Sequence, residues 1–228
     1  MQEIFEVTED LMLNNLKIVQ DKRYYRFTSD SILLSKFPVC KKGEKVADFC
    51  AGSGIVGLHF YGLNEQKVKS VTLFELQEEL CNLAEKSIQL NGLENKFSLV
   101  KGKLQEAPKS MNSSFSLILC NPPYKKKDSG ERNLSSHIAI CRHECELTQK
   151  EICQTAKRLL VPGGRLCICQ RIERLTELFS DLKECGLEPS KMAFVRTPKG
   201  NPYLVIVEAT KDKKPQLKVL REIVNGEE

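Results

Sequence analysis

The sequence lacks several features that would point to other classes of protein. It contains no tryptophan and only three histidines. No apolar run approaches the roughly 20 residues that a membrane-spanning helix needs, and the acidic residues 1–6 lack the basic and apolar regions of a secretory signal. The absence of a long apolar run predicts that the protein has no membrane span, and the absence of a secretory signal predicts that it is cytoplasmic. With 41% hydrophobic and 29% charged residues, the composition is globular, and one domain is expected at 228 residues.

Paired Cys-x-x-Cys motifs are also missing, although the chain has ten cysteines. Most cysteines lie in apolar runs such as LILC and LCICQ, where a thiol behaves as a small hydrophobic group. Disulfides are disfavoured in a cytosolic chain of this size. The alternative is a zinc site, whose candidate ligands are Cys141, His143, Cys145 and Cys153. Because their spacing differs from that of paired zinc knuckles, no metal is predicted.

Strand and helix patterns alternate along the chain, which indicates an α/β fold. Strands are predicted at residues 16–20, 45–49, 70–74, 97–101, 116–120, 165–170, 192–197 and 203–209, and helices at 31–37, 55–61, 77–90, 148–160 and 174–185. The PKGNP segment before the last strand is short enough for a hairpin, so that strand is predicted to run antiparallel. We expect three regions: an otherwise irregular N-terminal segment, 1–44, whose helix covers the site; a domain at 45–210; and a charged tail, 211–228, that frays.

A glycine-rich turn, DFCAGSG, joins the strand at 45–49 to the following helix. Gly52, Gly54 and Gly57 have the spacing Gly-x-Gly-x-x-Gly, which lets a backbone approach a ligand closely at a helix N-terminus. The next strand leads to Glu75, 23 residues after Gly52. An acid about 20 residues beyond such a turn typically accepts hydrogen bonds from ribose hydroxyls. The alternative is a surface carboxylate that caps the helix at 77–90.

The stretch LILCNPPY, residues 117–124, ends a predicted buried strand on two prolines, which cannot donate to a sheet ladder. This places Asn121 and Tyr124 at a carboxyl end of the sheet, where ligands bind in open α/β folds. The Asn121 side-chain oxygen and the Pro122 carbonyl form a rigid pair of acceptors for an amine on a flat conjugated group, such as adenine, cytosine or a glutamine amide. The alternative is a turn that merely ends a strand.

A polar loop, KKKDSGERNLSSH, follows this stretch. Its cationic residues are Lys125, Lys126, Lys127 and Arg132. Contact with phosphate is one interpretation and a solvated loop is the other. The net charge of the whole chain, +5, mildly favours an anionic partner but is too small to establish nucleic-acid binding.

Together, these features resemble the class I S-adenosylmethionine-dependent methyltransferases. Asn-Pro-Pro-Tyr is similar to the signature of adenine-N6 and glutamine-N5 methyltransferases. The segments LKIVQDKRYYRFTSDSILLSKF, RHECELT and LLVPGGRLCICQRIERL further resemble the bacterial tRNA1(Val) adenine-N6-methyltransferase family, which modifies the adenine beside the anticodon. The resemblance covers nearly the entire chain. It implies a Rossmann-like fold with a seven-stranded, mostly parallel sheet, an antiparallel last strand and helices on both faces.

The resemblance also implies roles for individual residues, with S-adenosylmethionine as the cofactor. The residues expected to bind the cofactor are Asp30, Asp48, Ala51, Gly52, Ser53, Gly54, Glu75, Leu104 and Asn121. Asn121 and the Pro122 carbonyl would hold the target amine and Tyr124 would stack on its base, whereas Pro123 and the four cations of the loop would contact RNA. Many relatives have an acid after the glycine that follows the third strand of the domain. Here Lys103 follows Gly102, which leaves recognition of the cofactor adenine to Leu104 and backbone groups.

The predicted reaction is direct transfer of the sulfonium methyl group to adenine N6 in a tRNA anticodon loop by a monomeric enzyme. Two alternatives remain open. One is a different N-methyltransferase, which acts on a protein glutamine or on another amino group of a nucleic acid, although the glutamine-modifying relatives usually carry an additional N-terminal helical domain. The other is a non-catalytic module that binds cofactor or RNA.

Overall fold

The order of the chain's elements follows that of a doubly wound α/β fold. The computed structural model describes residues 5–24, 27–122 and 147–226. Its helices are α1 (Ser29–Lys36), α2 (Ile55–Asn64), α3 (Glu78–Leu90), α5 (Gln149–Leu159) and α6 (Leu175–Glu184). Its strands are β1 (Glu6–Asp10), β2 (Lys17–Asp21), β3 (Glu44–Phe49), β4 (Val68–Glu75), β5 (Phe97–Lys101), β6 (Phe115–Cys120), β7 (Leu160–Arg171), β8 (Leu187–Arg196), β9 (Pro202–Lys211), β10 (Lys218–Val219) and β11 (Ile223–Val224). Short 3-10 turns lie at Leu104–Glu106, Lys109–Met111 and Ile172–Arg174.

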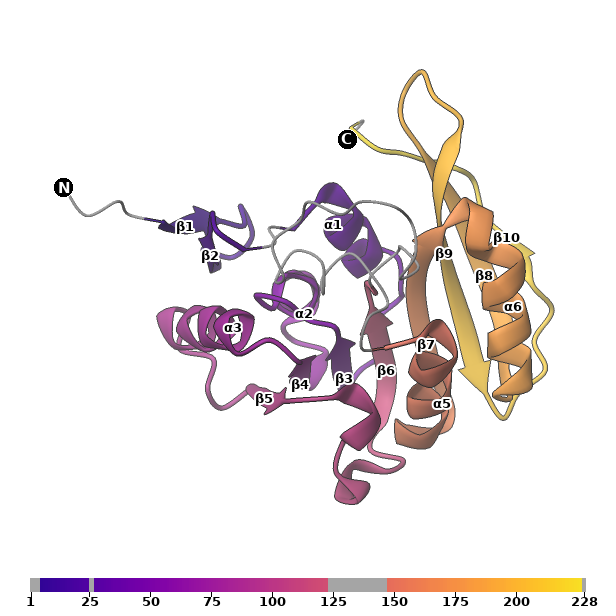
Figure 1. Ribbon diagram of the computed structural model, residues 1–228, viewed down its shortest axis with the longest axis horizontal. Coiled ribbons are helices and arrows are strands. Elements are labelled where there is room, and N and C mark those ends of the chain that lie inside the picture. Colours follow the sequence, from indigo (N-terminus) through magenta and orange to yellow (C-terminus); the bar gives the residue numbers. More distant parts are fainter. Residues whose placement is uncertain (1–4, 25–26, 123–146, 227–228) are drawn as a thin grey trace.

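The central sheet has the strand order β10-β8-β9-β7-β6-β3-β4-β5, and β11 also pairs with β8 (Figure 1). Neighbouring strands from β5 to β7 are parallel, and β9 runs antiparallel to both β7 and β8. The seven strands β3 to β9 therefore confirm the predicted mostly parallel sheet and the antiparallel last strand. The order changes direction at β3, whose neighbours are β4 and β6, so the carboxyl ends of these strands form the crevice in which this kind of sheet binds ligands.

Helices cover both faces of the sheet, as predicted, because its strands carry apolar side chains on both faces. On β3, for example, Val46 packs in a cluster with side chains of α1, α2 and α3, whereas the next residue, Ala47, packs in a cluster with side chains of α5 and α6. The alternation repeats on β6, where Leu117 joins the first cluster and Ile118 the second. Because helices pack on both faces of the sheet, the carboxyl ends of its strands, where the predicted site residues lie, are held in place.

The N-terminal segment is more regular than expected. The strand predicted at 16–20 is β2, but it pairs antiparallel with β1 to form a hairpin where irregular chain was predicted. The sequence of β1, EVTED, is rich in acids that are rare in strands, and this composition conceals the strand. The hairpin lies beside α3 (Figure 1), where the Val19 N–H donates to the Ser87 hydroxyl over 2.9 Å.

The C-terminal segment also differs from expectation, because it does not fray throughout. Its short strands β10 and β11 run parallel to β8. Beyond them, the Asn225 amide donates to the Ser29 hydroxyl over 2.8 Å and to the Tyr203 hydroxyl over 2.7 Å. The tail therefore reaches back to the start of α1, a contact between residues almost 200 positions apart that no local sequence pattern encodes.

Candidate active site

The register of the sheet brings the predicted site segments to one edge. Phe49, the last residue of β3, lies opposite Phe74 of β4 on one side and Cys120 of β6 on the other. The chain that follows each strand therefore leaves the sheet at the same level. The glycine turn, Glu75 and Asn121 are neighbours for this reason.

The glycine turn has the backbone conformation that its sequence predicts. Gly52 and Gly54 have φ values of +59° and +89°, in the left-handed region that glycine adopts without a steric penalty. Gly57 is needed for a different reason, since a Cβ there would lie 2.8 Å from a methyl carbon of Leu73. A Cβ on Gly52 would have no neighbour within 4 Å. The turn thus packs tightly against the sheet at Gly57 and leaves open space at Gly52, as close approach of a ligand requires.

Cys50, in the same turn, also has a positive φ of 57°, which the sequence did not suggest. Only glycine, asparagine and aspartate commonly adopt this conformation, so a cysteine there is strained. Ala51 and Ser53, both predicted to border the cofactor, are buried. The Ala51 N–H donates to the Phe74 carbonyl over 3.0 Å, which ties the turn to the end of β4.

Asp48 is a buried carboxylate whose two oxygens differ in their surroundings. Its Oδ2 accepts a hydrogen bond of 2.8 Å from the Gly57 N–H, whereas its Oδ1 is buried and has no hydrogen-bond partner among the described residues. Burial raises the pKa of Asp48 to about 8; the Gly57 N–H opposes this shift and the negative charge of Glu75 adds to it. A buried acceptor without a donor costs free energy. The Oδ1 atom is therefore suited to form a hydrogen bond with a bound ligand or its water, as an acceptor when Asp48 is charged and as a donor when it is protonated.

Glu75 is buried, so the interpretation as a surface carboxylate is wrong. Its Oε2 accepts from the Gly52 N–H over 2.8 Å, and its Oε1 accepts from the N–H groups of Leu76 and Gln77, each over 2.9 Å. Burial raises the pKa of Glu75, and these three donors oppose the shift. The carboxylate thus connects the glycine turn to the segment that enters α3. Its contact with ribose stays a prediction.

Asn121 follows β6, and its side-chain amide is held from two sides. Its Nδ2 donates to the Ser31 hydroxyl over 2.9 Å, and its Oδ1 accepts from the Cys169 thiol over 3.1 Å. Ser31 belongs to α1 and Cys169 to β7, so three separate elements meet at this amide. Pro122 is buried beside it. The sequence analysis missed Ser31 and Cys169, and the position of Ser31 next to the expected site residue Asp30 was the only available signal.

Several predicted site residues lie outside the described part of the chain. They are Pro123, Tyr124, Lys125, Lys126, Lys127 and Arg132, together with the candidate zinc ligands Cys141, His143 and Cys145. The remaining candidate ligand, Cys153, is buried in α5. The described residues contain no group of three or more His, Cys, Asp or Glu side chains that could hold a metal ion.

Asp30 lies on α1, one residue before Ser31, and contacts the antiparallel side of the sheet. Its carboxylate accepts a hydrogen bond of 2.9 Å from the Tyr203 hydroxyl, which in turn accepts from Asn225. Burial raises the pKa of Asp30, and the Tyr203 hydroxyl and the nearby Arg171 oppose the shift. Burial and the charge of Asp30 raise the pKa of Tyr203 to about 12. Asp30 therefore helps to fix α1, and its expected contact with the cofactor stays a prediction.

Leu104 follows the end of β5 and is buried in the same apolar cluster as Phe74. The preceding Gly102 has a φ of +123°, and its N–H donates to the Glu75 carbonyl over 2.9 Å. Leu104 is thus tied to the site edge through Gly102. Its predicted contact with adenine is not tested by these interactions.

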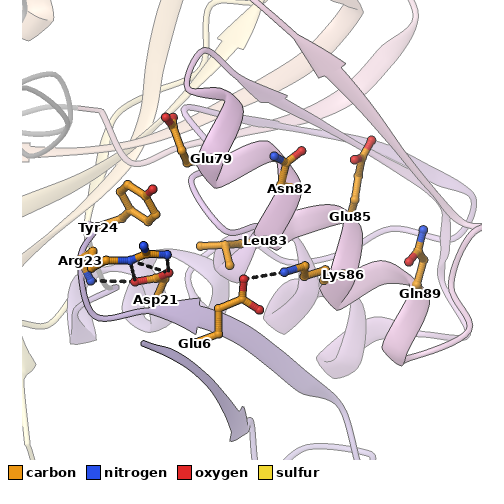
Figure 2. Close-up of a pocket in the computed structure, with 10 residues that line it drawn as sticks. All are labelled: Glu6, Asp21, Arg23, Tyr24, Glu79, Asn82, Leu83, Glu85, Lys86 and Gln89. Carbon is orange, nitrogen blue, oxygen red and sulfur yellow. Dashed lines mark hydrogen bonds and ion pairs between the residues drawn. The ribbon is translucent and has the colours of Figure 1, made fainter. Parts of the chain in front are cut away.

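A separate cavity of about 360 Å³ lies between the N-terminal hairpin and α3 (Figure 2). It is lined by Glu6, Asp21, Arg23, Tyr24, Glu79, Asn82, Leu83, Glu85, Lys86 and Gln89. None of the predicted site residues in the described chain is among them. As Figure 2 shows, charged groups in the cavity pair with one another: Arg23 with Asp21, and Lys86 with Glu6. With four carboxylates and two cations, this lining does not attract phosphate.

Solved structures share the fold. A predicted O-methyltransferase of Agrobacterium tumefaciens matches 85% of this chain and 86% of its own, with a TM-score of 0.66 at 18% identity. The P. horikoshii protein TYW2, solved in complex with MeSAdo, matches 93% of this chain and 74% of its own, with a TM-score of 0.66 at 14% identity. The fold is that of the class I S-adenosylmethionine-dependent methyltransferases.

The family is shown by the sequence itself. Residues 28–184, more than half of the chain, match the model of the methyltransferase small domain, so the protein belongs to that family and is a methyltransferase that uses S-adenosylmethionine. It is also similar to two relatives named tRNA1(Val) (adenine(37)-N6)-methyltransferase. The relative from Parabacteroides distasonis is 24% identical over 203 residues, 86% of this chain and 82% of the relative. The relative from Tolumonas auensis is 25% identical over 193 residues, 83% of this chain and 78% of the relative. No helix in the described residues is long and apolar enough to cross a membrane.

Proposed function

We propose that the protein methylates N6 of an adenine in RNA, and that the target is the adenine beside the anticodon of tRNA1(Val). The observation that carries this proposal is the position of Asn121. Its amide lies at the carboxyl end of β6, one strand from the glycine turn, and is held by Ser31 and Cys169 before the buried Pro122. The names of the two bacterial relatives support the choice of substrate.

The residues of the glycine turn would hold the cofactor at the edge of the sheet. The open space at Gly52 and the Oδ1 of Asp48, which has no partner among the described residues, fit a ligand there. Glu75, which accepts from backbone N–H groups, would also accept from the ribose hydroxyls of the cofactor. Leu104 would contact the cofactor adenine, and Asp30 would lie near the amino end of the cofactor. The further cofactor contacts that we propose are Ala51, Ser53 and Gly54. S-adenosylmethionine supplies an electrophilic methyl group on a sulfonium leaving group.

The target amine would donate its two hydrogen bonds to Asn121 Oδ1 and to the Pro122 carbonyl. An aromatic amine is a poor nucleophile because its lone pair is delocalised into the ring. Two acceptors stabilise the positive charge that develops on nitrogen during attack, so the step needs positioning and electrostatics more than a general base. Orientation alone can contribute about 7–11 kcal/mol in well-aligned systems.

RNA binding would come mainly from residues outside the described chain, with a contribution from the N-terminal segment. In this proposal Tyr124 stacks on the extruded base, Pro123 lies beside it, and the loop cations Lys125, Lys126, Lys127 and Arg132 contact phosphates, together with the N-terminal segment. Flipping costs least for a base that is already unpaired, as in an anticodon loop. Because phosphate contacts release counterions, tRNA affinity should fall steeply with salt, and affinity that is indifferent to salt would exclude this assignment of the loop.

The test is incubation of the purified protein with labelled S-adenosylmethionine and either total tRNA or a cellular protein extract. N6-methyladenosine in the digested tRNA would establish the reaction, and sequencing of the labelled fragment would identify the position. Label in protein alone would support glutamine methylation. Cofactor binding without any transfer would support a non-catalytic module.

A further inference from the structure

The contact between Ser31 and Asn121 joins the first turn of α1 to the residue that follows β6. Ser31 is only 1% exposed, in the first turn of α1, and its hydroxyl accepts from Asn121 Nδ2 over 2.9 Å. The two residues are 90 positions apart. The contact therefore exists only when α1 lies over the end of β6, and it acts on the side chain that the proposed reaction depends on.

An asparagine amide is nearly symmetric in shape but not in hydrogen bonding. If it turns by 180°, it presents two N–H donors where an oxygen should accept, and donors repel a target amine. Around Asn121 the two sides differ: Ser31 accepts from the nitrogen, and the Cys169 thiol donates to the oxygen. The contact with Cys169 thus marks the orientation in which Asn121 presents its oxygen as an acceptor.

The start of the helix that carries Ser31 is also fixed by another contact, since Asp30 accepts from the Tyr203 hydroxyl over 2.9 Å. Ser31 is therefore held in place by a contact that does not involve Asn121.

We propose that Ser31 is a positioning residue that holds the Asn121 amide with its oxygen turned toward the target amine. The proposal rests on the proposed function for its catalytic consequence but not for the orientation itself. Ser31 acts through Asn121, so its removal should lower turnover and leave cofactor binding unchanged.

The test compares Ser31→Ala with Ser35→Ala, a matched control on the same helix with the same 1% exposure and its own buried hydrogen bond. Loss of one hydrogen bond is expected to lower kcat about tenfold in Ser31→Ala, with KM for S-adenosylmethionine unchanged, and to leave kcat of Ser35→Ala near that of the parent. In an Asn121→Ala background, Ser31→Ala should lower kcat no further, because the residue through which it acts is gone. Equal losses of kcat in the two serine variants, or an additional loss in the Asn121→Ala background, would overturn the proposal.

A second measurement decides the orientation without any RNA substrate. In ¹⁵N-labelled protein, the side-chain NH₂ signals of Asn121, assigned by their disappearance in Asn121→Ala, should shift and exchange faster with water in Ser31→Ala and stay in place in Ser35→Ala. Unchanged Asn121 signals in Ser31→Ala would overturn the proposal even if the enzyme is active. If the parent protein methylates no RNA, the proposed function fails, and these signals still show whether Ser31 holds the amide.

Discussion

Buried carboxylates lie at both ends of the parallel strands, but the groups that they pair with differ between the two ends. At the amino end, Glu44 binds the Arg165 guanidinium with both oxygens, each over 2.8 Å, and Glu208 lies 3.1 Å from the same guanidinium. At the carboxyl end, Asp48 and Glu75 form no ion pair within the described residues and accept from backbone N–H groups instead.

This difference in pairing is consistent with different roles for the two ends of the strands. A carboxylate that is paired with a buried cation inside the protein offers little to a ligand. Asp48 and Glu75 lack such pairing, and burial raises the pKa of each. Perturbed carboxylates in a crevice are typical of functional sites. We infer that the amino end serves the stability of the fold and the carboxyl end keeps its acceptors for ligands.

The largest effect is expected from Arg165→Met, which breaks the cluster at the amino end. Two carboxylates, Glu44 and Glu208, would stay buried without their main cation, although Lys191 lies 3.4 Å from Glu208. Removal of one partner from a buried ion pair typically costs about 3–5 kcal/mol of unfolding free energy. Urea unfolding measures this loss; a change below about 1 kcal/mol would mean that the amino end is no more dependent on its charges than the surface.

Asn121→Ala tests the carboxyl end. Loss of one acceptor aimed at developing charge is expected to lower kcat about 10²–10³-fold, by analogy with the loss of one hydrogen-bond donor from an oxyanion hole. Affinity for S-adenosylmethionine, measured by calorimetry, should fall much less than kcat, because the glycine turn and Glu75, which supply most of the expected cofactor contacts, are untouched. Undiminished turnover would remove Asn121 from the mechanism.

Asp48→Asn should change how stability depends on pH. The folded-state pKa of Asp48 is raised from its ordinary 3.8 to about 8. The stability associated with its protonated form is therefore fully present below the ordinary pKa and is lost as pH rises toward about 8. The variant keeps an oxygen for the Gly57 N–H but carries no charge, so it should lose less stability than the parent between about pH 5 and about pH 8.

The control for this pH experiment is built into the comparison. His59 is present in both proteins, and burial and the nearby Lys36 lower its pKa to about 4. Its contribution has the opposite sign, since it is present above the ordinary His pKa and is lost as pH falls, and it cancels in the difference between the parent and the variant. If the urea midpoints of the parent and of Asp48→Asn differ by the same amount at every pH, Asp48 is already charged in the folded protein.

The smallest effect is expected from Lys150→Met, which breaks an ion pair on the surface. Lys150 lies 2.8 Å from Glu184, and both side chains are more than half exposed, at 52% and 55%. Solvent screens pairs of this kind, so they contribute little to stability, and less still at high salt. A loss in urea unfolding comparable to that of Arg165→Met would show that burial does not separate strong from weak pairs in this protein.

Local patterns in the sequence were sufficient for much of the fold. Strand β5 has the predicted bounds, and the helix predicted at 148–160 is α5, which begins at a capping box formed by Thr148 and Glu151. The prolines after Cys120 end β6 where a buried strand has to stop. These features depend on neighbouring residues alone, and for that reason they could be predicted without the structure.

Other features were decided by residues far apart in the chain. The acid-rich β1 becomes a strand only through its pairing with β2, and the charged tail becomes ordered strands only beside β8. The strand predicted at 165–170 is β7, which begins earlier, at Leu160, although Pro162 and Gly163 are unfavourable in a strand. Pairing partners supply hydrogen bonds that offset poor local propensity.

The site divides in the same way. The sequence alone determined the glycine turn, Glu75 and Asn121, since each is a local motif at the end of a strand, and it determined the family. Only the tertiary structure decided that Ser31 and Cys169 hold the Asn121 amide and that the carboxylate of Asp48 keeps one oxygen without a partner. The physical reason is that hydrogen bonding in a protein interior depends on which groups folding brings within about 3 Å of one another, and separation along the chain carries no record of that.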